Sequence, residues 1–169
     1  MLRRLRENGP VVLVPLAWTF AIAAHRDLLS IRTVLIAHLV MDVILIAFTA
    51  LSWRDMAEGV LLTWRRVLVA GTVVTLAGTA ALLADPVVEP VLVGVVVAWL
   101  AIPAAGLADT GRRVEIYPRA YLAGAALAGI GTVLYVVGVS NGSLTVTTAG
   151  LVVGGLGQTL GIVAAVVGY

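Results

Sequence analysis

The chain contains no cysteine and no lysine, and only 12% of its 169 residues are charged. Without cysteine it can form no disulfide, no thiolate metal site and no iron–sulfur cluster, and it has no cysteine nucleophile. It also lacks the motifs of zinc proteases, serine hydrolases and phosphate-binding loops. Its two histidines, His25 and His38, fall at different depths of the expected helices, which disfavours haem ligation. We therefore predict no catalytic residue, no metal and no cofactor.

Apolar residues dominate what remains: 61% of the chain is hydrophobic, and the mean hydropathy is +1.09. An ordinary soluble domain is about half apolar and a quarter charged. A soluble fold of this length could not bury so much apolar surface, whereas a lipid bilayer leaves it in a suitable solvent. We expect residues 1–169 to form a single transmembrane domain of an integral membrane protein, with the lipid bilayer as its main partner.

Six apolar stretches predict six membrane-spanning helices. A helix needs about 20 apolar residues to cross a hydrocarbon core of about 30 Å. The uncharged stretch after Arg119 is too long for one crossing, and the turn sequence at 140–143 divides it. Trp53 and Trp64 predict an interfacial helix at about 53–64. The expected fold is an all-α bundle with short loops and helices at about 9–25, 32–52, 65–84, 89–108, 119–139 and 144–167.

The arginines predict the orientation of this bundle. They lie at the ends of apolar runs and are not interleaved with aromatic residues, so nucleic acid is not an expected partner. If every stretch crosses, Arg26 and Arg32 lie on one side and the other nine arginines lie opposite. The positive-inside rule then predicts a multi-pass protein of the cell membrane with both termini cytoplasmic. An alternative is that the basic and apolar segment before His25 is a cleaved signal peptide.

Small residues predict that the third, fifth and sixth helices form a tightly packed face. Gly124 and Ala128 are four residues apart, as are Gly150 and Gly154, a spacing that lets membrane helices approach closely. Packing within the chain is the simpler interpretation. The alternative is that such a face binds a second copy of the chain or a partner membrane subunit.

A weak internal sequence similarity relates the first and fourth helices. Ala17-Trp18 and Ala98-Trp99 each follow a proline and a Val/Leu run. In a six-helix topology these two helices run in opposite directions. Many transporters are built from three-plus-three inverted repeats with this relation. Chance matches in Ala/Val/Leu-rich sequence are the alternative explanation.

Asp42 is the strongest candidate for a functional residue. It lies near the middle of the second helix, where a carboxylate costs about 2.5–3.5 kcal/mol in lipid and is usually functional. His38 lies one turn away on the same face, so the pair could share a hydrogen bond or a proton. We predict a ligand, proton or ion site; a polar clasp that fixes helix register is the alternative.

Other polar or aromatic residues at similar depth are candidates to line a cavity at this site. Tyr135 of the fifth helix is expected to lie closer to His38 than to Asp42. Pro103 cannot donate to the carbonyl of Trp99, so a local opening of the fourth helix is expected there. The candidate lining residues are Trp18, Thr75, Trp99, Tyr135 and Gln158.

These features favour a small transporter or a membrane substrate-binding component with its site at Asp42 and His38. A non-catalytic scaffold or assembly subunit that packs through its glycine-rich helices is the second hypothesis. The third is a lipid-modifying membrane enzyme, which is disfavoured because the spans contain one deep carboxylate. Arg112 and Arg113 are further candidates, to bind an anionic lipid headgroup.

Overall fold

The computed structural model describes residues 2–168, with side chains described from residue 11 onward. It is all-helical, as the sequence predicts. Five helices are long and apolar enough to cross a membrane, whereas the apolar part of the first, Val11–His25, is shorter. The six helices are α1 (Leu2–His25), α2 (Ile31–Ser52), α3 (Gly59–Leu83), α4 (Glu89–Arg113), α5 (Pro118–Ser140) and α6 (Leu144–Gly168).

The expected interfacial helix at 53–64 is not a separate element. Residues 53–58 form turns, and α3 begins at Gly59, earlier than predicted. Glu58 has an extended backbone, and Gly59 has a φ of 59°, a left-handed conformation that favours glycine. This break separates Trp53 from Trp64, so the two indoles do not share one helical stripe.

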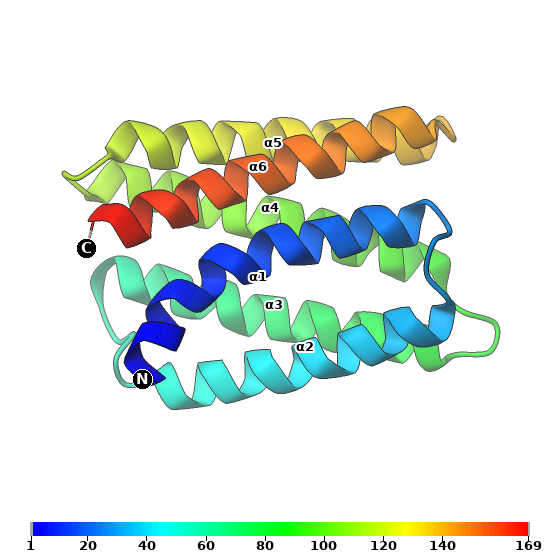
Figure 1. The fold of residues 1–169 in the computed structure, drawn as a ribbon, viewed down its shortest axis with the longest axis horizontal. Coiled ribbons are helices and arrows are strands. Elements are labelled where there is room, and N and C mark those ends of the chain that lie inside the picture. Colours follow the sequence, from blue (N-terminus) through cyan, green and yellow to red (C-terminus); the bar gives the residue numbers. More distant parts are fainter. Residues whose placement is uncertain (1, 169) are drawn as a thin grey trace.

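The helices run alternately up and down, and neighbours in sequence are mostly neighbours in space (Figure 1). α4 packs between α3 and α5, α6 packs against α5, and α1 returns to pack against α6. α2 packs against α3 at the edge of the bundle. Only 11% of its most apolar window is buried, against 33–44% for α4, α5 and α6. α2 is therefore the most loosely held of the long apolar helices.

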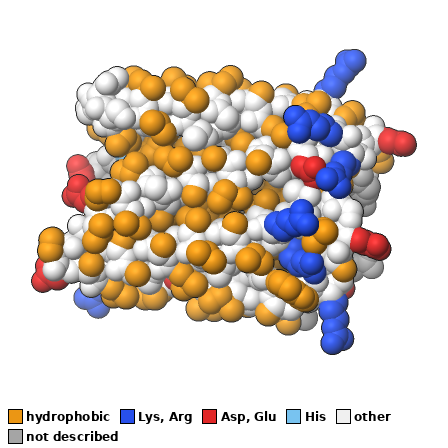
Figure 2. All heavy atoms as spheres, turned by 180° about the vertical axis from the view of Figure 1, so that it is seen from behind, with side chains coloured by type: hydrophobic (Ala, Val, Ile, Leu, Met, Phe, Trp, Pro, Cys, Tyr) orange, Lys and Arg blue, Asp and Glu red, His pale blue; other side chains and the backbone are white. Residues whose placement is uncertain are grey.

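Charged side chains gather at the two ends of the bundle and leave an apolar belt between them (Figure 2). At the end where α1 begins and α6 ends, six arginines lie in the connector after α2 or in the adjoining turns of α3, α4 and α5. Arg26 and Arg32 lie at the opposite end, where α1 ends and α2 begins. Arg3, Arg4 and Arg6 lie outside the described side chains. The asymmetry agrees with the predicted orientation, and the side of the membrane that each end faces remains a prediction.

Glycine holds α5 and α6 together, as their small-residue spacing predicts. A Cβ built on Gly131 would collide with the backbone of Gly154, and one built on Gly124 would lie 2.6 Å from the carbonyl oxygen of Gly157. These helices therefore approach until their backbones touch. The predicted packing within the chain is confirmed for this pair, whereas the small residues of α3 face α2 and α4 instead. It makes one side of the bundle tightly packed, in contrast to the edge that α2 forms.

Candidate functional site

Asp42 lies at the midpoint of α2 and faces α3. Its side chain is only 5% exposed. The Thr79 hydroxyl of α3 donates a 2.6 Å hydrogen bond to Asp42 Oδ2. Asp42 Oδ1 is buried and has no hydrogen-bond partner among the described residues. The carboxyl group is thus held by one hydroxyl and retains an unused acceptor in the apolar layer of the protein.

His38 and Asp42 face the same helix but do not form the direct hydrogen bond that their spacing allows. His38 Nδ1 donates instead to the carbonyl of Val34, one turn back in α2, at 3.1 Å. The imidazole ring packs over Gly78 of α3, where a Cβ would lie 3.1 Å from Nε2. The local backbone bond and the space left by this glycine hold the ring away from the carboxylate.

Four of the five predicted lining residues form one hydrogen-bonded chain across the bundle. Trp18 of α1 donates from Nε1 to Gln158 Oε1 of α6 at 3.1 Å. Gln158 Nε2 donates to the carbonyl of Trp99 in α4 at 2.7 Å. Trp99 Nε1 donates to the Thr75 hydroxyl of α3, also at 3.1 Å. These residues bond to one another, so the expected cavity lining is here a structural network.

Pro103 explains why this series of hydrogen bonds includes a backbone carbonyl of α4. Proline has no N–H, so the Trp99 carbonyl one turn earlier has no intrahelical donor. The side-chain amide of Gln158 supplies the missing hydrogen bond from α6. The sequence predicted the free carbonyl and the polar point at Gln158, but it did not predict that one satisfies the other.

The two indoles of the predicted repeat make contacts of a similar kind. Trp18 of α1 packs against Gly155 of α6, where a Cβ would lie 2.9 Å from the indole, and donates to Gln158 one turn later. Trp99 of α4 packs against Gly71 of α3, where a Cβ would lie 2.6 Å away, and donates to Thr75 one turn later. Exchanging the first three helices with the last three relates α1 to α4 and α6 to α3. The two contacts thus join corresponding helices of the predicted inverted repeat, although Gly155 meets the Cβ–Cγ end of Trp18 and Gly71 meets the six-membered ring of Trp99.

Tyr135 is not near the predicted site. It is fully buried in α5, and its hydroxyl lies 2.9 Å from Nε2 of His25 at the end of α1. His25 Nδ1 lies 2.8 Å from the Ala21 carbonyl, which can only accept, so Nδ1 carries a proton. Nε2 of the neutral ring then accepts from the tyrosine. The expected proximity of Tyr135 to His38 is wrong, because α1, not α2, packs along this side of the bundle.

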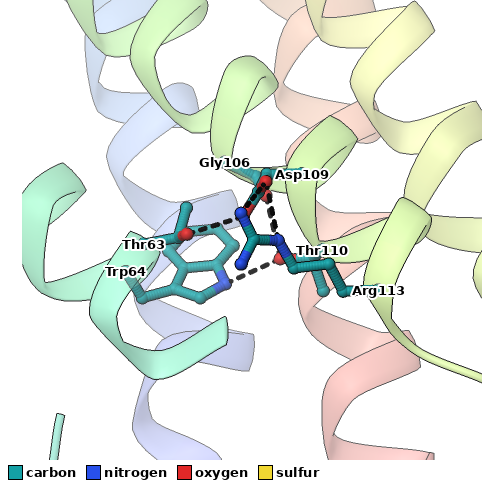
Figure 3. Close-up of polar contacts among 6 residues, drawn as sticks. All are labelled: Thr63, Trp64, Gly106, Asp109, Thr110 and Arg113. Atoms are coloured by element: carbon teal, nitrogen blue, oxygen red, sulfur yellow. Dashed lines mark hydrogen bonds and ion pairs between the residues drawn. The ribbon is translucent and has the colours of Figure 1, made fainter. Parts of the chain in front are cut away.

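A second polar cluster joins α3 to α4 at the arginine-rich end (Figure 3). Thr63 donates to Asp109 Oδ2 at 2.6 Å, and Arg113 donates to Asp109 Oδ1 at 2.9 Å. Beside them, Trp64 Nε1 donates to the Thr110 hydroxyl at 3.1 Å. Arg113 thus pairs within its own helix, and both Arg112 and Arg113 are exposed. The i, i+4 spacing of Asp109 and Arg113 is the sequence feature that could have predicted this pair.

The described site residues offer hydrogen-bonding groups and one deep carboxyl group. In the part of the chain that the structure describes, no group of three or more histidine or acidic side chains could hold a metal ion. No family model, curated protein or solved structure matches the chain. Fold and composition therefore define only the class of the protein, a small helical protein of the polytopic membrane type. Its function has to be argued from Asp42.

Proposed function

We propose that this chain is a small membrane transport protein, or the membrane substrate-binding component of one, in which the Asp42 carboxyl group binds and releases a proton. The observation that carries the proposal is the buried, unpartnered Oδ1 of Asp42 at the midpoint of an apolar helix. Ionisable groups at such depth are costly in lipid and most often mark ion or proton pathways.

A proton fits this site better than a metal cation does. Calcium takes six to eight oxygen ligands, and magnesium demands nearly ideal octahedral coordination. The described contacts of Asp42 supply one threonine hydroxyl, and the described part of the chain has no metal-binding cluster. Among the described residues no arginine or histidine forms an ion pair with Asp42. A proton neutralises the carboxylate without any further ligand.

The similar Trp18 and Trp99 contacts give the transport hypothesis a second support. They join the helix pairs that an inverted repeat of three helices would relate, and that architecture is common in secondary transporters. The two halves then differ in one instructive respect. α5 and α6 are closed by glycine contacts, whereas α2 and α3 meet through Asp42 and Thr79. The looser first half is the one that carries the ionisable group.

Proton movement across reconstituted vesicles tests the proposal. With a potassium diffusion potential as the driving force, vesicles containing the wild-type chain should take up protons faster than protein-free vesicles. Asp42→Asn should abolish the difference, because an amide accepts no proton in this range. Asp109→Asn is the matched control and should retain uptake, since Asp109 lies at the end of the bundle. Equal uptake by wild type and Asp42→Asn would contradict the assignment.

One observation favours a second function, that of a scaffold or assembly subunit. The outward face of α2 is an open apolar surface, formed by Ile36, Leu39, Val40, Val43 and Ile44. A helix of a partner membrane subunit, or of a second copy, could pack there. Vesicles with no proton uptake, together with a larger assembly after crosslinking through this face, would favour that function. The lipid-enzyme hypothesis gains nothing, because Arg113 is already paired with Asp109.

A further inference from the structure

The face of α2 that the bundle covers carries polar residues together with the buried Leu45. Asp42, Leu45 and Ser52 are buried on it, and His38 and Thr49 are half-buried. These residues are spaced alternately four and three apart, so they form a single stripe along the helix. The residues on either side, such as Val43, Ile46, Ala47, Ala50 and Leu51, are apolar and exposed.

Two atoms on this stripe have unused hydrogen-bonding capacity. Asp42 Oδ1 and Thr49 Oγ1 are both buried without a partner in the described part of the chain. They are seven residues apart, which is two turns or about 10 Å along the helix. On α3, which runs antiparallel, Thr72 lies two turns from Thr79 towards the same end. Thr72 donates to the carbonyl of Leu68 and keeps its acceptor lone pairs.

This arrangement suits water better than a dry contact. Polar residues within membrane helices face the bundle interior or a water-filled cavity. Buried polar atoms without a protein partner are normally satisfied by ordered water. The contrast with α5 and α6 is informative, because backbone contacts at Gly131 and Gly154 leave no room between those helices. The seam between α2 and α3 has polar side chains on both sides and the least buried helix as one wall.

We infer that the seam between α2 and α3 is a hydrated path that brings protons to Asp42 from the end of the bundle where α2 ends, past Ser52 and Thr49. The inference rests on the proposed protonation of Asp42 and names its access route. A hydronium ion transfers a proton to a carboxylate oxygen, an O–H bond forms, and water remains. Towards the other end, the His38 ring packs on Gly78 and closes the seam.

Thiol labelling tests the path directly, because the chain has no native cysteine. The full chain is reconstituted in phosphatidylcholine vesicles, with one cysteine introduced at a time. Thr49→Cys and Ser52→Cys lie on the stripe, and Ala47→Cys and Ala50→Cys are controls at similar depth on the exposed face. A membrane-impermeant methanethiosulfonate should modify the stripe positions at least about ten-fold faster, because the reactive thiolate forms in water and not in lipid.

The side of entry gives a second readout. The reagent should reach Thr49→Cys from the end of the bundle where α2 ends and not from the end where it begins. Labelling no faster than at Ala47→Cys and Ala50→Cys, or labelling from the opposite side, would overturn the path. If the stripe cysteines are not labelled faster than the controls but proton uptake still depends on Asp42, the path is refuted and the proposed function is not. A wet seam with uptake that survives Asp42→Asn would instead refute the proposed function.

Discussion

Gln158 of α6 donates a 2.7 Å hydrogen bond to the Trp99 carbonyl of α4, which Pro103 leaves without an intrahelical donor. The same side chain accepts the indole N–H of Trp18. One amide thus joins three helices, α1, α4 and α6, near the middle of the bundle. Because Gln158 is only 5% exposed, no solvent water readily replaces either bond when it is lost.

Replacing this amide should destabilise the bundle. Gln158→Leu keeps the approximate volume but leaves the Trp99 carbonyl and the Trp18 indole N–H unsatisfied. We expect the free energy of unfolding in detergent to fall by about 2–4 kcal/mol, because each buried group left unsatisfied costs about 1–3 kcal/mol. The adjacent Thr159→Val is the control. Thr159 donates within its own helix to Gly155, so its loss should cost less than about 1 kcal/mol.

Pro103→Ala provides an internal check on the cause. Alanine restores an N–H that can reach the Trp99 carbonyl, so Gln158→Leu should cost about 1 kcal/mol less in that background. Gln158→Leu could instead lower the free energy of unfolding equally with Pro103 present and in the Pro103→Ala background. That result would mean that Gln158 does not replace the hydrogen bond that Pro103 cannot donate.

Glycine substitutions should separate the packed face of α5 from its open face. A Cβ at Gly131 meets the backbone of Gly154, whereas one at Gly129 meets nothing within 4 Å. Gly131→Ala should therefore lower the unfolding free energy by about 1–3 kcal/mol through overpacking. Gly129→Ala should be neutral or stabilising by about 0.5–1 kcal/mol, because alanine favours the helix. Equal thermal stability of both variants in detergent would contradict the backbone contact between α5 and α6.

Single cysteines should report the sidedness that the arginines predict. Leu28→Cys, Val88→Cys and Asn141→Cys lie in exposed connectors at one end of the bundle, and Glu58→Cys and Glu115→Cys lie at the other. In intact cells an impermeant maleimide should label the first three and spare the last two, because the arginine-rich end is predicted to be cytoplasmic. Labelling of Glu115→Cys from outside would reverse the orientation.

The membrane class and the six helices could be predicted from the sequence because uncharged stretches and arginine clusters are properties of the chain itself. Asp42 could be found in the same way, since a carboxylate ten residues inside an apolar helix is visible without a fold. The turn at 140–143 was equally predictable, and Gly142 has the positive φ of such a turn, 65°.

The partners of these residues could not be predicted, because they depend on which faces meet. Asp42 bonds to Thr79, which lies one turn beyond the candidate Thr75 on α3. Tyr135 bonds to His25 rather than approaching His38, since α1 returns to α6 while α2 lies at the edge. The break before Gly59 depends on a backbone conformation that the spacing of Trp53 and Trp64 did not reveal.

The central claim is that the Asp42 carboxyl exchanges a proton within the membrane, and infrared difference spectroscopy measures this directly. Spectra of the reconstituted chain are recorded in H2O and after transfer to D2O, because a carboxyl proton that exchanges is replaced by deuterium. We predict a protonated-carboxyl band that shifts in D2O, is missing from Asp42→Asn and persists in Asp109→Asn. A band that is unchanged in Asp42→Asn, or no exchanging band in the wild type, would contradict the account.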